Sequence, residues 1–347
     1  MVKKIFATLI AVLMIFATGC NNDADFENLS DYESEASTII ENEEPAPELL
    51  VNPLTGVAEL GDANKVNRRP VAVMINNLDN TVRKVQTGLS KADIIYETEV
   101  EGGLTRLMAV YQDISDLDKI GTVRSARYQY IDLALGHNAV YVHFGFNTYC
   151  KSHLTDVDDI EFKDNSKGSK RISNGLATEH TAYALAKELN EHISNEFNMS
   201  VKSVAPWVNF TDETLTLDGG PATSVNIPYP ASSTTFTYDS ASGLYTRLLG
   251  STVQTDYFTQ EKTQVKNIFI LLTSMSYYSD GKTRKVDFSG GDGYYITNGT
   301  VQFIKWEKGA STNGFKFTDT NGNEIKVSAG NSWVSIANKS TCNPSIQ

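Results

Sequence analysis

Two arginines bracket a serine in the stretch DKIGTVRSARYQYIDLALG, residues 118–136, and an apolar run at helical spacing follows directly. Guanidinium groups beside the unpaired backbone N–H groups of a helix start favour an anionic ligand such as a phosphate, pyrophosphate or carboxylate. We therefore predict that Ser125 caps a helix over residues 125–136 and that Arg124 and Arg127 bind an anion there.

Three more residues are expected at the same site. The sequence EGG at residues 101–103 predicts a sharp connection between two strands, so that Glu97 and Arg106 face each other across the turn. His143 ends a buried strand and would face the same pocket. The predicted ligand-binding residues are therefore Arg106, Arg124, Ser125, Arg127, Glu97 and His143.

A structural role is the alternative for this cluster. The arginines would then form ion pairs with acidic neighbours, namely Glu97, Glu99 or Asp132. The histidine could equally be a core residue whose hydrogen bonds are satisfied within the fold. A structural role requires a fixed carboxylate for each guanidinium, whereas a binding role leaves at least one guanidinium open to solvent.

Motifs of several enzyme classes are missing from the sequence. It has no G-x-S-x-G, no Walker A motif and no G-x-G-x-x-G, which excludes a hydrolase elbow, a P-loop and a dinucleotide site. Without H-x-x-x-H or C-x-x-C spacing, we expect neither a preformed zinc site nor a cofactor. A binding module is favoured. The alternative is a phosphotransferase or hydrolase acting on a phosphorylated envelope precursor, with candidate acids and bases at Asp93, Glu97 and Asp132.

The start of the chain has the features of a lipoprotein signal peptide. Two lysines precede an apolar run over residues 5–17, which is too short to span a bilayer. Thr18-Gly19-Cys20 then resembles a bacterial lipobox. We predict a signal peptide at residues 1–19 and acyl chains such as palmitate on Cys20, which would anchor the protein on the extracytoplasmic face of the cell membrane. An ordinary secretory signal with a chance cysteine is the alternative.

An acidic tether is predicted over residues 20–51, beginning at the lipidated cysteine. It carries ten Asp and Glu residues and no Lys, Arg or His, so like-charge repulsion should keep it extended and disordered. These residues supply most of the formal net charge of −12, which gives no support for a nucleic-acid partner. The expected partners are the lipid bilayer, through acylated Cys20, and an anionic envelope polymer or an envelope protein.

The remainder of the chain changes character near its middle. Residues 52–205 alternate short apolar runs with runs at helical spacing, which predicts an α/β layered sandwich domain. Residues 206–340 lose the helical period and contain repeated Asp-Gly and Asn-Gly dipeptides, which predicts a small, mostly antiparallel β domain. The expected fold is thus α+β overall, with a linker near 200–230 and a tail at 341–347.

Cysteine use fits an exported protein of this size. With Cys20 assigned to lipid, Cys150 and Cys342 are the two that remain. Two cysteines do not make a disulfide framework, so buried free thiols are favoured and a bridge between them is the alternative.

Several longer stretches resemble a known family. VQTGLSKADIIYETEVEGGLTRLMAVYQD and the following IGTVRSARYQYIDLA are similar to the YerB-like lipoprotein family of Gram-positive bacteria. GLYTRLLGSTVQTDYFT, NIFILLTS and GNSWVSIA resemble the second domain of that family, so that the resemblance runs from Asn52 to about Ala337. The family has no established biochemical activity. The resemblance therefore implies an architecture and a location, and no reaction.

Overall fold

The computed structural model describes residues 49–60 and 62–347. The predicted signal peptide, Cys20 and nearly all of the predicted tether lie outside the described residues. At the end of the tether, Leu49–Val51 forms strand β1, which pairs antiparallel with β2 (Ala58–Leu60). The tether prediction is wrong for these three residues, because the run LLV finds a hydrogen-bonding partner in the strand that follows it.

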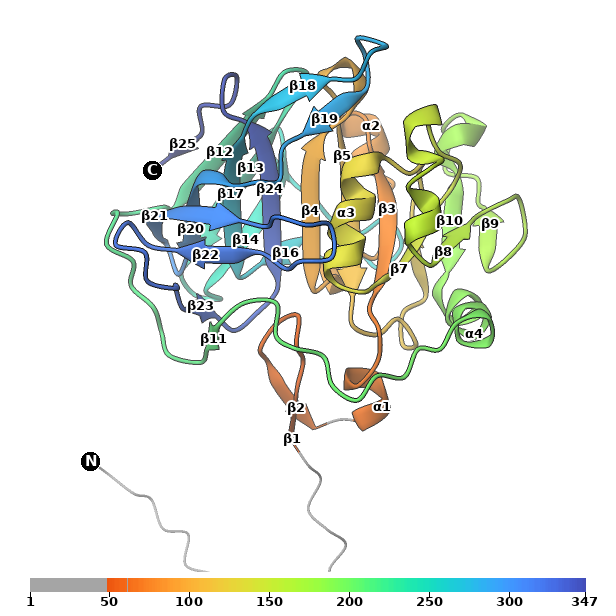
Figure 1. Cartoon of the computed structure of the whole chain (residues 1–347), viewed down its shortest axis with the longest axis horizontal. Coiled ribbons are helices and arrows are strands. Elements are labelled where there is room, and N and C mark those ends of the chain that lie inside the picture. Colours follow the sequence, from red (N-terminus) through yellow and green to blue (C-terminus); the bar gives the residue numbers. More distant parts are fainter. Residues whose placement is uncertain (1–48, 61) are drawn as a thin grey trace, which may run out of the picture. The chain divides into compact units, whose positions relative to one another are not determined.

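A mixed sheet takes strands from both halves of the chain (Figure 1). Along this sheet, five strands of the C-terminal half precede five of the N-terminal half, in the order β22-β21-β20-β17-β24-β4-β5-β3-β7-β8. The two sets meet in the parallel pair β24–β4, where Ser332 lies opposite Ile94 and Ile336 lies opposite Thr98. The strands are β3 (Val71–Asn77), β4 (Ile94–Glu99), β5 (Thr105–Tyr111), β7 (Val140–His143), β8 (Asp159–Glu161), β17 (Asn267–Thr273), β20 (Gly291–Thr297), β21 (Thr300–Glu307), β22 (Lys316–Thr318) and β24 (Ser332–Asn338).

The two halves therefore share one core. The α+β fold is as the sequence predicts, but the boundary at 205/206 does not divide two separately packed bodies, since the described chain forms one compact unit. Every residue of β4 and of β24 is buried, so each of these strands needs a neighbour at both edges and a layer over both faces. Local patterning does not reveal a strand partner that lies far away in the chain, which is why the sequence predicted separate domains.

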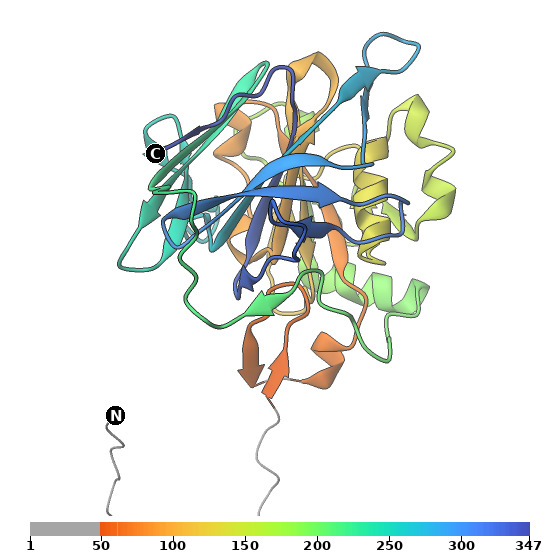
Figure 2. The same ribbon diagram turned by 60° about the vertical axis from the view of Figure 1, so that its left-hand side comes forward.

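A second, antiparallel sheet covers one face of the large sheet (Figure 2, teal strands). Its order is β15-β14-β13-β12-β25, and β16 also pairs with β14. Phe236 of this sheet packs edge-on against Trp333 of β24, with ring centroids 5.3 Å apart. Because β25 lies within residues 341–347, the predicted tail is part of this sheet. The strands are β12 (Ser224–Tyr229), β13 (Ser232–Asp239), β14 (Leu244–Leu249), β15 (Thr252–Val253), β16 (Gln264–Val265) and β25 (Ser345–Ile346).

Helix α3 (Tyr128–Gly136) packs on the opposite face of the large sheet (Figure 2, yellow). Its apolar side chains share a hydrophobic cluster with Met74 of β3, whereas the next residue, Ile75, belongs to the cluster under the second sheet. Arg127 takes the N-cap position of α3, but its side chain makes no capping hydrogen bond to the helix. Ser125 is not the N-cap, because the chain is still extended there and its neighbour Ala126 forms a β-bridge with Phe146.

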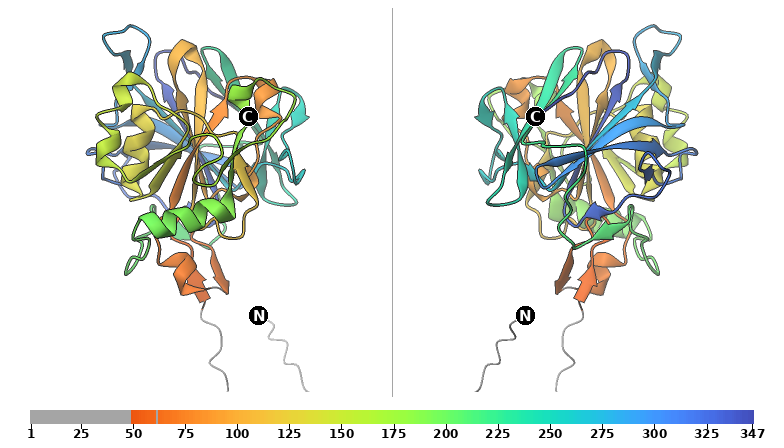
Figure 3. Two further views of the ribbon diagram at one scale, coloured as in Figure 1. Left: turned by 90° about the vertical axis from the view of Figure 1, so that its right-hand side faces the viewer. Right: turned by 90° about the vertical axis from the view of Figure 1, so that its left-hand side faces the viewer.

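A small antiparallel sheet, in the order β6-β10-β9, lies beside the large one. Its strands are β6 (Lys119–Gly121), β9 (Ser169–Arg171) and β10 (Ala182–Leu185). The pattern EHTAYALAKELNEHISNEF, residues 179–197, predicts one helix, but α4 occupies only Ala186–Glu196. The first part is a strand instead, because β10 pairs with β6 on one edge and β9 on the other. Helix α4 buries one apolar face below the strands (Figure 3, left, green).

Short elements complete the described chain. The hairpin of β18 and β19 stands out from the body at the top of Figure 1. Within residues 49–60 and 62–347, no helix combines the length and the apolar character that crossing a bilayer requires. The short elements are α1 (Ala63–Val66), α2 (Asn80–Arg83), β11 (Phe210–Thr211), β18 (Met275–Tyr277), β19 (Arg284–Val286), β23 (Val327–Ser328), and the 3₁₀ turns Leu89–Lys91, Glu101–Gly103, Thr148–Cys150, Leu154–Asp156 and Thr178–His180.

Both cysteines of the folded part are buried free thiols. Burial raises the pKa of Cys150 to about 11 and that of Cys342 to about 12, so both thiols are protonated at neutral pH. The favoured interpretation is confirmed, and the alternative bridge between the two cysteines is not formed.

Candidate functional site

Three arginines from two separate segments converge beside the start of α3. Arg106 lies on β5, and Arg124 and Arg127 lie in the extended segment between β6 and α3. The guanidinium groups of Arg106 and Arg127 both donate hydrogen bonds to the carbonyl oxygen of Ser125. The large sheet positions this segment, because the backbone N–H of Arg124 donates to the carbonyl of Met74 at 3.0 Å. The structure thus brings together the three arginines and the backbone of Ser125.

The three guanidinium groups differ in their acidic partners. Nε of Arg127 lies 2.8 Å from both carboxylate oxygens of Glu101. Arg124 is 28% exposed and lies 3.8 Å from the carboxylate of Glu179, whose backbone carbonyl also accepts a hydrogen bond from it at 3.1 Å. Arg106 donates to the backbone. Of these three described residues, Arg127 is the one that makes a close ion pair.

Burial and neighbouring charges shift the pKa values of Arg106, Arg124 and Glu101. Burial, together with the charges of Arg127 and Arg124, lowers the pKa of Arg106 to about 9, and Glu101 opposes this shift. Burial also lowers the pKa of Arg124, where Glu179 opposes the shift and Arg127 adds to it. Burial raises the pKa of Glu101, but the hydrogen bond and charge of Arg127 outweigh it, so that the net shift is downward. Arg124 and Arg127 thus lie close enough to Arg106 for their charges to act on it.

Residues to which the sequence does not point complete this surface. Arg171 is close enough to Arg124 to lower its pKa, and the guanidinium of Arg171 lies 4.6 Å from the ring centre of Phe144. Nδ1 of His180 lies 2.8 Å from Nδ2 of Asn76, near the end of β3. Their approach to the arginines depends on the pairing of β10 with β6 and β9, so no motif or spacing signals it.

Glu97 does not border the arginines as predicted. In the hairpin register Thr98 lies opposite Arg106, so these two side chains share one face of the sheet and Glu97 points to the other face. The prediction considered the turn between the strands and not the alternation of side chains along them. On its own face the carboxylate of Glu97 accepts hydrogen bonds from Asn77, Thr105, Thr234 and Trp333.

His143 is not available to a ligand at the arginines. Its side chain is fully buried, with Nδ1 2.9 Å from the carbonyl oxygen of Gly145 and Nε2 2.9 Å from the carboxylate of Asp159. Since both ring nitrogens have partners within the fold, His143 is the satisfied core histidine of the alternative interpretation. The carbonyl oxygen of Ser125 accepts a hydrogen bond from Arg106. The N-cap position that the sequence predicts for Ser125 is taken by Arg127.

The arrangement at the arginines provides charge and hydrogen-bond donors. The carboxylates of Glu101, Glu179 and Asp164 each face a guanidinium group of this surface, those of Arg127, Arg124 and Arg171 in turn. Elsewhere in the part of the chain that the structure describes, no three His, Cys, Asp or Glu side chains are grouped so that they could hold a metal ion. The arrangement of the arginines is therefore best suited to binding a negatively charged group.

Two family models cover most of the chain. "Protein of unknown function (DUF3048) N-terminal domain" matches residues 54–200, and "Protein of unknown function (DUF3048) C-terminal domain" matches residues 225–334. The chain belongs to the DUF3048 family. The two DUF3048 matches fall on the two regions that differ in sequence pattern, whereas the large sheet combines strands from both.

This DUF3048 chain is also similar to a curated protein and to a solved structure. "Putative lipoprotein YerB" from Bacillus subtilis (strain 168) is 27% identical over 300 residues, which cover 83% of this chain and 86% of that protein. The crystal structure of the YerB protein from Bacillus subtilis matches with a TM-score of 0.72 and 26% identity, over 85% of this chain and 99% of that one. The resemblance to the YerB-like lipoproteins is confirmed, and the relative's name agrees with the lipoprotein interpretation of the N-terminus.

Proposed function

We propose that this chain is a membrane-anchored extracytoplasmic lipoprotein that binds a phosphorylated cell-envelope glycan or glycan precursor at Arg106, Arg124 and Arg127. The observation that carries the proposal is the imbalance of charge: three guanidinium groups converge, and the close ion pair is made by one of them. Like charges held together disfavour their own ionisation, and a bound anion relieves this. An anion between the arginines would interact favourably with all three.

The surroundings of the arginines support a phosphorylated sugar as the ligand class. A phosphate group presents several strong acceptor oxygens to guanidinium donors that approach from different directions. Arg124 is the accessible arginine, at 28% exposure. Phe146, which pairs with Ala126 in the adjacent β-bridge, is 39% exposed and offers an apolar surface to a sugar ring. An acidic envelope protein is the competing ligand, and a binding experiment with phosphorylated sugars separates the two.

Replacing Arg124 by Gln is expected to weaken binding of pyrophosphate and of a sugar 1-phosphate by about 10- to 100-fold, which corresponds to the loss of one charge-assisted hydrogen bond. Because Arg124 is partly exposed and its carboxylate partner is 3.8 Å away, the free energy of unfolding should change by less than about 1 kcal/mol. Titration calorimetry at low salt measures the affinity, and urea unfolding measures the stability.

Lys326→Gln is the matched control, since it removes a charge from an exposed pair with Glu213 and should leave both quantities unchanged. Arg127 is less suitable for this test, because its loss also leaves Glu101 without its close partner. A wild-type protein that binds neither phosphorylated probe, combined with a large loss of stability in Arg124→Gln, would identify the arginines as a structural cluster.

Anchoring is tested separately through Cys20. Cys20→Ala is expected to prevent lipid attachment, so that the protein leaves the membrane fraction or remains an uncleaved precursor. Cell fractionation with immunoblotting measures this, and mass spectrometry of the N-terminal peptide identifies the modified residue. Asn21→Ala should behave like the wild type. Wild-type protein in the soluble fraction, cleaved at another position, would contradict the anchor without bearing on the arginines.

A further inference from the structure

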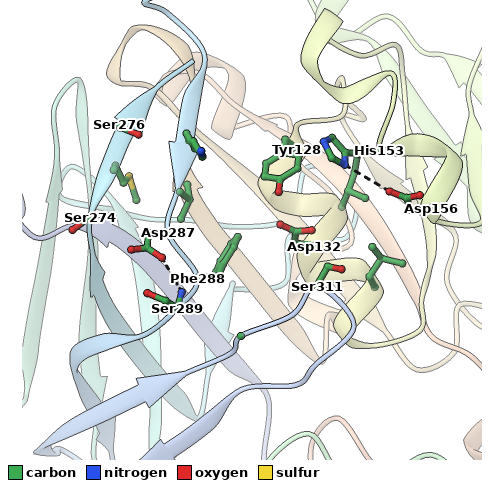
Figure 4. Close-up of a pocket in the computed structure, with 16 residues that line it drawn as sticks. Tyr128, Asp132, His153, Asp156, Ser274, Ser276, Asp287, Phe288, Ser289 and Ser311 are labelled. Atoms are coloured by element: carbon green, nitrogen blue, oxygen red, sulfur yellow. Dashed lines mark hydrogen bonds and ion pairs between the residues drawn. The ribbon is translucent and has the colours of Figure 1, made fainter. Parts of the chain in front are cut away.

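A cavity of about 840 Å³ lies between α3 and the segment that follows β19 (Figure 4). One wall carries Tyr128 and Asp132 from α3, and the facing wall carries Asp287, Phe288 and Ser289. The hairpin of β18 and β19 contributes to the second wall, so we call this cavity the hairpin cleft. Its volume lies within the range of about 300–1,000 Å³ that is usual for small-molecule sites.

The polar lining of the hairpin cleft consists mainly of hydroxyl and carboxylate groups. The hydroxyls come from Tyr128 and from four serines distributed over both walls. Three carboxylates, those of Asp132, Asp156 and Asp287, line the cleft as well. The rings of Tyr128 and Phe288 supply apolar surface between these groups. A ligand here meets hydrogen-bonding groups and apolar faces side by side.

The charges of the hairpin cleft differ from those at the arginines. The lining has three carboxylates and a single lysine, Lys285, so it does not favour a phosphate. A simple cation is not favoured either, because the charge of Lys308 acts on Asp132 and the imidazole of His153 lies 3.6 Å from the carboxylate of Asp156. Carboxylates under these conditions serve best as acceptors for the hydroxyl groups of a neutral ligand.

Buried contacts hold both walls in place. Arg284 of β19 forms an ion pair of 2.6 Å with Glu99 of β4, and the two side chains are only 8% and 1% exposed. This pair fixes the hairpin to the large sheet. On the other side, Nζ of Lys308 donates to the carbonyl of Ser311 at 2.6 Å and fixes the loop that carries Ser311 into the lining. Walls that are already ordered lose little conformational entropy when a ligand binds.

We propose that the hairpin cleft binds a neutral carbohydrate, whose hydroxyl groups donate to Asp132 and Asp287 and whose ring contacts Tyr128 and Phe288. A sugar ring combines an apolar C–H face with a rim of hydroxyl groups, which matches this lining. The cleft is separate from the proposed anion site. Arg127 precedes α3 and pairs with Glu101, whereas the next residue, Tyr128, faces the cleft.

The test uses the mature lipidated protein in a detergent that has no sugar headgroup. The probes are the neutral trisaccharides maltotriose and N,N′,N″-triacetylchitotriose, measured by saturation-transfer NMR and titration calorimetry. At least one of them should bind saturably at millimolar concentration or below, and excess pyrophosphate should not displace it. Asp132→Asn should weaken binding about tenfold or more, because a charged acceptor becomes a neutral one. The exposed Asp218→Asn is the matched control and should have no effect.

A second variant keeps the test informative if Asp132→Asn does not fold. Ser276 lies on β18 at an exposed position that lines the cleft, so Ser276→Trp fills the cavity without entering the core and should abolish sugar binding. Failure of both trisaccharides to bind the wild type would overturn the proposal, as would sugar binding that survives in Ser276→Trp. Displacement of the sugar by spermidine would also overturn it and identify an amine site. None of these results depends on whether the arginines bind an anion.

Discussion

A chain that ends after residue 205 is expected not to fold on its own. β4 is buried along its whole length, and the truncated chain lacks β24, which pairs with it in parallel over Ile94 to Thr98. The unpaired N–H and C=O groups of a central apolar strand would then face water or another chain, which favours aggregation. The same truncation removes the second sheet from one face of the large sheet. The remaining strands would lose both the partner strand of β4 and the sheet that covers one of their faces.

Expression of residues 49–205 alone tests this expectation. The fragment should be insoluble or lack near-ultraviolet circular dichroism, and co-expression with residues 206–347 should restore a soluble complex. Deletion of residues 344–347 is the control, because it removes β25, a two-residue strand at the edge of the second sheet, and should leave the protein folded. A soluble, monomeric 49–205 fragment with a dispersed NMR spectrum would show that the N-terminal half is an autonomous domain.

Replacing Glu97 by Gln is expected to lower the free energy of unfolding by about 3 kcal/mol, because a buried carboxylate that accepts four hydrogen bonds loses its charge. Glu97 is fully buried and accepts a hydrogen bond from Nε1 of Trp333 at 3.2 Å. The guanidinium of Arg247, also fully buried, lies 4.5 Å from the centre of the same indole ring. Burial lowers the pKa of Arg247 to about 9, and the charge of Glu97 opposes that shift. Gln has nearly the same shape, so the variant removes the charge and turns one accepting oxygen into a donating NH2 group that faces another donor.

Urea unfolding at neutral pH measures the effect. Glu307→Gln is the matched control, because Glu307 pairs with Lys316 at the surface, where both side chains are 62% exposed, and a change below about 1 kcal/mol is expected. The double variant Glu97→Gln with Arg247→Met should be more stable than Glu97→Gln alone, since it removes the second buried charge as well. Unchanged stability in Glu97→Gln together with altered binding of pyrophosphate would place Glu97 at the anion site, as the sequence predicted.

Some features of the fold could be predicted because they depend on neighbours in the chain. The turn Glu101-Gly102-Gly103 joins β4 to β5, and Asn298-Gly299 joins β20 to β21. Gly102, Gly103, Asn298 and Gly299 adopt positive φ, which Gly and Asn tolerate best, so their identity marks the turns. The β24–β4 pair could not be predicted in this way. It depends on which buried strand edges meet in space, and no short-range pattern encodes that choice.

In the candidate site, too, contacts between near neighbours in the chain could be predicted and contacts between distant segments could not. Arg124 and Arg127 are neighbours in the chain, and Arg106 reaches them through a hairpin, so their convergence could be foreseen. The misplacement of Glu97 was avoidable, because the alternation of side chains puts it on the face that Arg106 does not occupy. Arg171 could not be foreseen. Its position depends on β9 and β10, and the second of these has the sequence pattern of a helix.

The pair formed by β4 and β24 also constrains the order of events while the protein is being made. Ile94–Glu99 leaves the ribosome well before Ser332–Asn338, which lies more than 200 residues later in the chain. Native pairing between segments so far apart in sequence is slow compared with the closure of local hairpins. The growing chain must therefore keep the unpaired edge of β4 from pairing with other segments until Ser332–Asn338 has been made. A product that terminates before residue 332 would carry that strand unprotected and become a target for aggregation and proteolysis.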